Sequence, residues 1–252
     1  MSVVLDLSSR RILVTGAGSG IGAACAQRLA EAGADVVVAD LRIDAAESCA
    51  DAVLAGGGRA VAVQLDVSDQ MAAERVAADL AATHPVTGLV NCAATWTLGP
   101  FVDADPASWQ RELQVNLVGT LLVTRALLPR MTAAGGGTVV NISSDAGRVG
   151  ERNQVVYSAA KAAVIGFTKA LAREVGRDSI RVNCIAPGLT RTPASAPYIE
   201  GLSDRDIARA YPLGRLGEPR DIADLTVFLS SDLSSWITGQ IVSVSGGYTT
   251  AG

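Results

Sequence analysis

The chain has 252 residues, of which 49% are hydrophobic and 18% are charged, and its 21 basic and 25 acidic residues give a formal net charge of −4. A charged fraction below the average of about 25% excludes disorder as the main state and indicates a large core. Because no long basic block is present to neutralise a phosphate backbone, we expect no nucleic-acid partner.

Neither a targeting segment nor a metal site is expected. The first eleven residues contain too short an apolar run for a secretion signal, and no stretch reaches the roughly 18 uninterrupted apolar residues of a membrane span. We therefore expect a cytoplasmic protein without a membrane partner. The four cysteines have no Cys-x-x-Cys spacing, and the single histidine, His84, precedes Pro85 at a predicted helix end. This pattern argues against disulfides, zinc sites and histidine catalysis.

Seven short apolar, β-branched runs predict buried strands. In chain order they are Arg11–Thr15, Asp35–Ala39, Ala60–Gln64, Gly88–Asn91, Thr138–Ile142, Ile180–Ile185 and Gln240–Val244. Longer stretches with helical spacing lie between them, among them Gly20–Ala32, Asp69–Ala82, Pro106–Met131 and Val155–Arg173. This alternation predicts an α/β fold, with a doubly wound, mostly parallel sheet in a single domain over residues 1–252.

The regular alternation breaks at residues 187–217. This stretch contains four prolines and no clear strand before a last helix begins near Pro219. A long irregular stretch in a compact domain is usually a lid or a binding loop, and we expect it to contact the substrate. The alternative is an excursion without a function.

The first predicted strand runs directly into a glycine-rich turn, which is followed by a helix. The turn contains Gly16, Gly18, Ser19, Gly20, Ile21 and Gly22. Glycines let the backbone approach a pyrophosphate, and the helix N-terminus offers free N–H groups and the positive end of its dipole. We expect these residues to bind a dinucleotide, and the alternative is a plain tight turn between strand and helix.

Carboxylates end the second and third predicted strands. Asp40 is suited to accept hydrogen bonds from the adenosine ribose hydroxyls and would repel a 2′-phosphate, which favours NAD over NADP. Arg42 nearby weakens this preference, and the alternative for Asp40 is a cap of the next helix. Asp66 is expected to accept a hydrogen bond from the adenine amino group, with a role at a helix start as its alternative.

Tyr157 and Lys161 are four residues apart near the start of a predicted helix, so their side chains lie on one face. Acid/base use of a tyrosine near neutrality requires its phenolate to be stabilised by about 3 pH units, or roughly 4 kcal/mol. We expect the neighbouring ammonium and a cationic nicotinamide ring to supply this stabilisation. The alternative is a tyrosine and a lysine that only pack side by side.

Two more polar residues stand near predicted apolar elements. Ser144 follows the fifth strand, at the edge where open α/β sheets bind ligands, and its hydroxyl is suited to a substrate carbonyl. Asn116 interrupts an apolar helical run. It either satisfies a backbone group at a bend or holds a water that links Lys161 to solvent.

Taken together, these motifs resemble the short-chain dehydrogenase/reductase family over essentially the whole chain. The residues that carry the resemblance are the glycine turn, Asp40, Asn91-Cys92-Ala93-Ala94, Asn116, Ser144, Tyr157-x-x-x-Lys161 and Pro187-Gly188-x-x-x-Thr192. The resemblance implies a seven-stranded Rossmann-like sheet and a nicotinamide cofactor. It also implies a catalytic tetrad of Asn116, Ser144, Tyr157 and Lys161.

The resemblance further implies which residues contact the cofactor. They are Gly16, Gly18, Ser19, Gly20, Ile21, Gly22, Asp40, Asp66, Val67, Asn91, Ala93, Tyr157, Lys161, Pro187, Gly188, Thr190 and Thr192. In this set Asn91 and Ala93 line the adenosine side, and Thr190 with Thr192 contacts the nicotinamide carboxamide. The chain departs from the family at Ala94, where the family has glycine, so the backbone there is expected to sit differently.

The implied reaction is reversible hydride transfer between a secondary alcohol and NAD. Residues 144–150, 212–217 and 237–240 are similar to those of 2-hydroxycyclohexanecarboxyl-CoA dehydrogenases and, more distantly, of 3-oxoacyl-thioester reductases. This similarity implies a β-hydroxyacyl-CoA-type or cyclic hydroxy substrate. The alternatives are a reductase of small cyclic or aromatic ketones and a non-catalytic NAD-binding regulator. A mean hydropathy of +0.31 and the apolar segment 236–242 suggest a homo-oligomer, and the family implies a tetramer.

Overall fold

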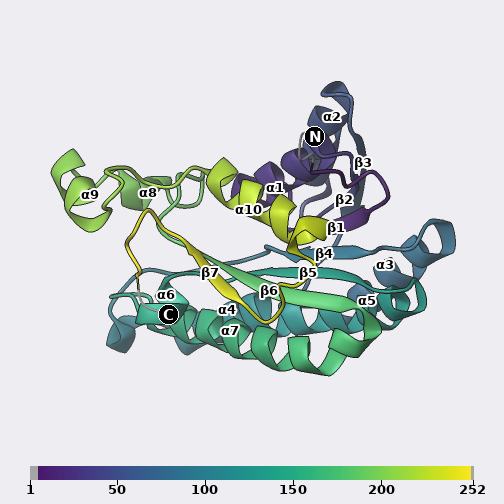
Figure 1. Ribbon diagram of the computed structural model, residues 1–252. Coiled ribbons are helices and arrows are strands. Elements are labelled where there is room, and N and C mark those ends of the chain that lie inside the picture. Colours follow the sequence, from purple (N-terminus) through teal and green to yellow (C-terminus); the bar gives the residue numbers. More distant parts are fainter. Residues whose placement is uncertain (1–4, 251–252) are drawn as a thin grey trace.

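The central strands of the sheet are buried along their whole length. Every residue of β1 (Arg11–Thr15), β4 (Gly88–Asn91) and β5 (Gly137–Ile142) is buried. Strands of this kind need helices on both sides and parallel neighbours that are joined through those helices. The computed structural model, which describes residues 5–250, has this architecture (Figure 1).

All seven strands are parallel and lie in the order β3-β2-β1-β4-β5-β6-β7. The outer strands are β2 (Asp35–Asp40), β3 (Arg59–Gln64), β6 (Ile180–Pro187) and β7 (Ile241–Val244). This confirms the predicted doubly wound sheet. The strand order reverses between β1 and β4, and at such a point the carboxyl ends of neighbouring strands leave a crevice between diverging connections.

Two hydrophobic clusters fill the space between the sheet and its helices. One includes residues of α1 (Gly20–Glu31), α2 (Ile43–Ala55) and α10 (Pro219–Ser230). The other includes residues of α3 (Gln70–Thr83), α5 (Thr120–Ala133) and α7 (Val155–Val175). Successive side chains of a strand enter alternate clusters, as Ile12, Leu13 and Val14 do in β1.

Two stretches differ from the prediction. The helix expected over Pro106–Met131 is divided into α4 (Pro106–Leu113), a π-helical segment η2 (Gln114–Gly119) and α5. The irregular stretch 187–217 contains the short helices α8 (Ala196–Ile199) and α9 (Asp204–Ala210). Both short helices project beyond the end of the sheet in Figure 1, where they extend the wall of the crevice.

The segment Val155–Asp178, which contains α7, is long and apolar enough, by length and composition alone, to cross a membrane. Within residues 5–250 no other helix meets this criterion. In the fold, α7 packs against β6 and against the short helix α6 (Ala146–Val149), and Leu171, Ala172 and Val175 enter the second cluster. Burial against the sheet therefore accounts for part of its apolar character.

Candidate active site

A cavity of about 710 Å³ lies at the carboxyl ends of the strands. Its wall begins at the glycine turn after β1, continues past the residues that end β2 and β3, and reaches the residues that follow β5 and β6. Open parallel sheets bind ligands at this edge. Residues that are far apart in the sequence, such as Gly16, Asp40, Ser144 and Thr192, therefore share one wall.

The glycine turn provides space that a side chain would fill. Gly16 has a φ of +64°, and a Cβ there would lie 2.7 Å from the Cα of Ala93. A Cβ on Gly22 would lie 2.2 Å from the carbonyl oxygen of Gly16. Ser19, the N-cap of α1, makes no side-chain cap hydrogen bond, and the first turn of α1 lines the cavity. A glycine-lined helix N-terminus of this kind fits a pyrophosphate.

Asp40 ends β2 on the cavity wall and supports the glycine turn. Its Oδ2 accepts a hydrogen bond from the N–H of Gly18 at 2.9 Å, and its Oδ1 accepts one from the N–H of Arg42 at 3.1 Å. Each carboxylate oxygen has a further lone pair that can accept from a ribose hydroxyl. Arg42 is the N-cap of α2, so Asp40 does not cap that helix, and Gly18 lies behind the cavity wall rather than on it.

Asp66 and Val67 follow β3 and line the same end of the cavity. Asp66 is exposed, and its Oδ1 accepts hydrogen bonds from the N–H and the hydroxyl of Ser68 at 2.9 and 2.6 Å. The N-cap of α3 is Asp69, whose side chain accepts from two N–H groups of the first turn. The helix-start role considered for Asp66 therefore belongs to Asp69.

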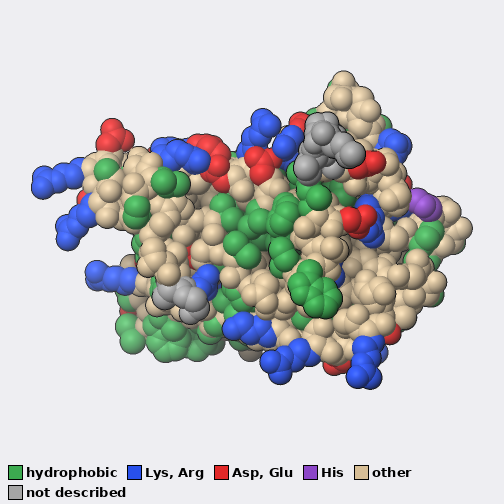
Figure 2. Space-filling model, viewed as in Figure 1, with side chains coloured by type: hydrophobic (Ala, Val, Ile, Leu, Met, Phe, Trp, Pro, Cys, Tyr) green, Lys and Arg blue, Asp and Glu red, His purple; other side chains and the backbone are tan. Residues whose placement is uncertain are grey.

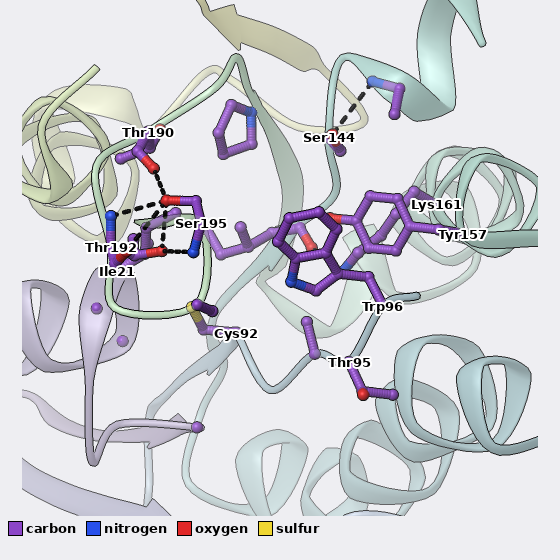
Figure 3. Close-up of a pocket in the computed structure, with 18 of the residues that line it drawn as sticks. Ile21, Cys92, Thr95, Trp96, Ser144, Tyr157, Lys161, Thr190, Thr192 and Ser195 are labelled. Carbon is purple, nitrogen blue, oxygen red and sulfur yellow. Dashed lines mark hydrogen bonds between the residues drawn. The ribbon is translucent and has the colours of Figure 1, made fainter. Parts of the chain in front are cut away.

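Tyr157, Lys161 and Ser144 lie together on the opposite part of the wall (Figure 3). The Lys161 Nζ lies 5.7 Å from the centroid of the Tyr157 ring and donates a hydrogen bond to the carbonyl oxygen of Ile142 at 3.0 Å. The Ser144 Oγ accepts a hydrogen bond from the N–H of Ala146 at 3.1 Å. A phenol, an amine and a hydroxyl thus meet at the carboxyl end of β5, as the sequence predicts.

Burial dominates the electrostatics of this group. Desolvation raises the pKa of Tyr157 to about 12, while a hydrogen bond with Ser144 acts in the opposite direction. Desolvation also lowers the pKa of Lys161 to about 8. The stabilisation expected from the ammonium together with a cationic nicotinamide ring therefore stays a prediction. Deprotonation of this phenol near neutrality requires further positive charge beside it.

Two asparagines expected in the site lie behind the cavity wall. Asn116, in η2, is fully buried, and its side chain donates to the carbonyl of Thr95 at 2.6 Å and accepts from the N–H of Thr95 at 3.1 Å. Both ends of its amide thus satisfy a backbone, which is the first of its two alternatives. The Nδ2 of Asn91 donates to Asn141 and Thr124 beneath the sheet, so Asn91 does not line the adenosine side as expected.

The segment after β6 completes the wall beside the glycine turn, where a Cβ on Gly20 would lie 3.3 Å from the Cγ2 of Thr192. Pro187, Gly188, Thr190 and Thr192 all line the cavity. The Ser195 Oγ donates to the carbonyl of Thr190 at 2.6 Å, accepts from the N–H of Thr192 at 2.9 Å and lies 3.0 Å from its hydroxyl (Figure 3). Ser195 therefore fixes both threonines, a role that its place in an irregular stretch gave no means of predicting.

Other residues of the wall were not singled out by the sequence. They include Leu41, Leu65, Arg111, Val115, Gln154, Tyr211 and Tyr248. Tyr248 stacks on Tyr211, with ring centroids 5.4 Å apart, and its hydroxyl lies 3.0 Å from a carboxylate oxygen of Glu151. Three segments that are distant in the sequence meet here, and local residue spacing does not predict such a contact.

The chain matches known proteins over nearly its whole length. The family model described as Enoyl-(Acyl carrier protein) reductase matches residues 16–249. The (3R)-3-hydroxyacyl-CoA dehydrogenase of Mus musculus is 40% identical over 257 residues, which cover 98% of this chain and 99% of the relative. The trans-4-hydroxycyclohexanecarboxylate dehydrogenase of Sinomonas cyclohexanicum is 42% identical and covers 99% of this chain and 96% of its own.

Solved structures are also similar to this chain. A protein of Beutenbergia cavernae, proposed to be an NAD(P)-dependent gluconate 5-dehydrogenase and holding NADP at low occupancy, is 38% identical. It superimposes with a TM-score of 0.92 and covers 98% of this chain and 99% of its own. A short-chain type dehydrogenase/reductase of Mycobacterium ulcerans is 34% identical, with a TM-score of 0.92 and coverage of 96% and 90%. With the shared motifs and sheet order, these matches show that the chain belongs to the short-chain dehydrogenase/reductase family.

Proposed function

We propose that this chain is an NAD-dependent dehydrogenase and ketoreductase that interconverts a secondary alcohol and a ketone. One observation carries the proposal: Tyr157, Lys161 and Ser144 share a cavity with a glycine turn that fits a pyrophosphate. A regulator that only bound the dinucleotide would have no use for a half-buried phenol beside a buried amine in that cavity.

The side chains of the cavity take distinct roles in the proposed reaction. A bound nicotinamide supplies the hydride acceptor or donor, and in its oxidised form a positive charge. During oxidation Tyr157, as the phenolate, takes the hydroxyl proton of the substrate. Ser144 hydrogen-bonds the developing carbonyl oxygen, and Lys161 binds ribose hydroxyls and passes the proton outward. Asn116 completes the tetrad from behind the wall, by holding the backbone of Thr95.

The proposed cofactor contacts are those expected from the sequence, with Gly18 and Asn91 supporting the wall instead of facing the cofactor. NAD is proposed over NADP because the Asp40 carboxylate would repel a 2′-phosphate. Arg42 also lines the cavity, and the relative from Beutenbergia cavernae holds NADP, so the two cofactors must be compared directly.

A β-hydroxyacyl thioester or a cyclic hydroxy acid is the proposed substrate class. The relatives named above act on 3-hydroxyacyl-CoA and on 4-hydroxycyclohexanecarboxylate. A small cyclic or aromatic ketone is the second candidate, and the aromatic side chains on the wall favour it. Besides Tyr157, they are Trp96, Tyr198, Tyr211 and Tyr248. Flat aromatic surfaces pack well against rings.

We further propose a single catalytic domain that works in the cytoplasm as a homotetramer. Several large apolar side chains support an assembly because they are exposed, and Trp236 is fully exposed. Hydrophobic side chains also gather over α10 on the face shown in Figure 2. Contiguous apolar surface is typical of interfaces. Light scattering should give four times the chain mass, and a monomeric mass would contradict the proposal.

The enzymatic proposal is tested by measuring the formation of NADH from NAD, and of NADPH from NADP, with 3-hydroxybutyryl-CoA, 4-hydroxycyclohexanecarboxylate and cyclohexanol. We expect turnover of at least one alcohol, with NAD preferred. Cofactor binding without turnover of any alcohol, or of the matching ketones in reverse, would favour the regulator. A clear preference for NADP would contradict the role assigned to Asp40.

A further inference from the structure

The segment that follows β4 carries Trp96 to the reacting tyrosine. The Trp96 and Tyr157 rings have centroids 6.5 Å apart and planes inclined by 47°. Trp96 and Tyr157 both line the cavity, and Figure 3 shows the indole beside the phenol. The position of this one side chain therefore shapes the space in which a substrate would approach the hydroxyl of Tyr157.

Two side chains, one from α4 and one from the adjoining η2, hold this segment on either side of Trp96. Asn116 pairs with both backbone groups of Thr95. Glu112 lies four residues earlier, and its Oε1 accepts a hydrogen bond from the N–H of Thr97 at 2.7 Å and a second, short one from the Thr97 hydroxyl. Residues four apart face the same side of a helix, so both side chains hold the segment from one side. We call the contacts of Glu112 with Thr97 and of Asn116 with Thr95 the clamp.

Glu112 is unusual because it is a buried carboxylate. Only 2% of the residue is exposed. Within residues 5–250 no lysine, arginine or histidine forms an ion pair with it. A carboxylate taken out of water is costly unless strong hydrogen bonds satisfy it. In the described part of the chain, both hydrogen bonds of the Glu112 side chain are with Thr97, so this side chain attaches Thr97 to α4.

A ring contact anchors the far end of the same segment. Phe101 stacks on Trp109 of α4, with centroids 4.9 Å apart and planes inclined by 7°. The segment is thus attached to α4 and η2 at positions 95, 97 and 101. Trp96 lies between the two attachments that use hydrogen bonds, which fixes its backbone more closely than its place in a loop would suggest.

We propose that Glu112 is a positioning residue that holds Trp96 beside Tyr157 and thereby sets which alcohols reach the phenol. The effect on specificity rests on the proposed function, whereas the effect on Trp96 does not. The indole gives the carbon skeleton of the substrate a flat apolar surface. Ring-bearing alcohols therefore depend on the clamp more than a compact alcohol such as 2-propanol does.

The first test needs no substrate. The chain has three tryptophans, so the double variant Trp109→Phe/Trp236→Phe leaves Trp96 as the only fluorescent indole. In this background Glu112→Ala should raise acrylamide quenching of Trp96 by about twofold, because the segment is released. Glu112→Gln keeps an acceptor oxygen and should stay near the parent. Ser234→Ala is the matched control, since Ser234 is fully buried, donates to backbone carbonyls and does not line the cavity.

The second test is kinetic. Glu112→Ala should raise KM for cyclohexanol by roughly fivefold to tenfold relative to KM for 2-propanol, with NAD affinity unchanged, because both hydrogen bonds to Thr97 are lost. Glu112→Gln should restore most of the discrimination, and Ser234→Ala should not alter it. Thr97→Val, which removes only the hydroxyl, should shift both readouts in the same direction and is the variant to rely on if Glu112→Ala does not fold.

The outcomes separate this proposal from the proposed function. Unchanged quenching in both Glu112→Ala and Thr97→Val would overturn the clamp, as would an equal change in Ser234→Ala. Altered quenching with unaltered selectivity between the alcohols would overturn the effect on specificity. Altered quenching in a protein that oxidises no alcohol would uphold the clamp on Trp96 while the dehydrogenase proposal failed.

Discussion

Replacing Lys161 by methionine should stabilise the fold. The side chain is 2% exposed, and desolvation lowers the pKa of Lys161 from 10.5 to about 8. A shift of this size corresponds to about 3 kcal/mol, because one pKa unit is about 1.4 kcal/mol. The folded state binds the proton less tightly than the unfolded state does, so the penalty is complete below pH 8. It disappears as the pH rises from 8 to 10.5.

Methionine has a similar shape and no charge, but it leaves the carbonyl of Ile142 without its hydrogen bond, which costs about 1–2 kcal/mol. We therefore expect Lys161→Met to be more stable than the wild type by about 1–2 kcal/mol at pH 7. Urea unfolding followed by circular dichroism, at one protein concentration, measures the difference. At pH 10 the wild type should regain about 2–3 kcal/mol relative to the variant. An equal difference at both pH values would refute the reasoning.

Three other perturbations test separate parts of the site. Gly22→Ala should destabilise the protein by about 2 kcal/mol or more in urea unfolding, because the new Cβ would clash with the Gly16 carbonyl oxygen. Gly166→Ala is the control: it lies in open space on α7 and should stabilise the protein by up to about 1 kcal/mol. Asp40→Asn keeps an acceptor for Gly18 and should raise the NADP-to-NAD ratio of kcat/KM roughly tenfold, and an unchanged ratio would contradict its role. Burial raises the pKa of Tyr157 to about 12. In the absence of cofactor, the ultraviolet absorbance of wild type and Tyr157→Phe should therefore show no difference from a Tyr157 phenolate below pH 10. A rise in that difference below pH 9 would contradict this expectation.

The central strands β1, β4 and β5 were predictable because they are buried on both faces. β1 and β4 have no solvent-facing side that would interrupt their apolar runs, and their observed bounds are the predicted ones. The break at η2 was not predictable. The run around Asn116 reads as one continuous helix, and the π-helical segment coincides with an Asn116 side chain bonded to Thr95, twenty-one residues away. A contact of that kind leaves no trace in local spacing.

The same reasoning explains which site residues the sequence placed correctly. Tyr157 and Lys161 share a helix face by their spacing, and Ser144 follows a strand, so their meeting needed only the sheet topology. The sequence did not determine which side of the sheet Asn91 faces, because successive side chains of a strand point to opposite faces and the last residue can point to either one. It points with Leu89 toward α5. Glu112 carried no local signal, because an acidic residue on a helix ordinarily faces solvent.

The most direct test of the account is Tyr157→Phe in the presence of NAD. The phenylalanine keeps the ring and removes only the hydroxyl that is assigned the proton transfer. NAD should bind as in the wild type, by calorimetry, while kcat for alcohol oxidation falls by about 10²–10⁴-fold. A variant that binds NAD and oxidises its alcohol at the wild-type rate would contradict the central claim.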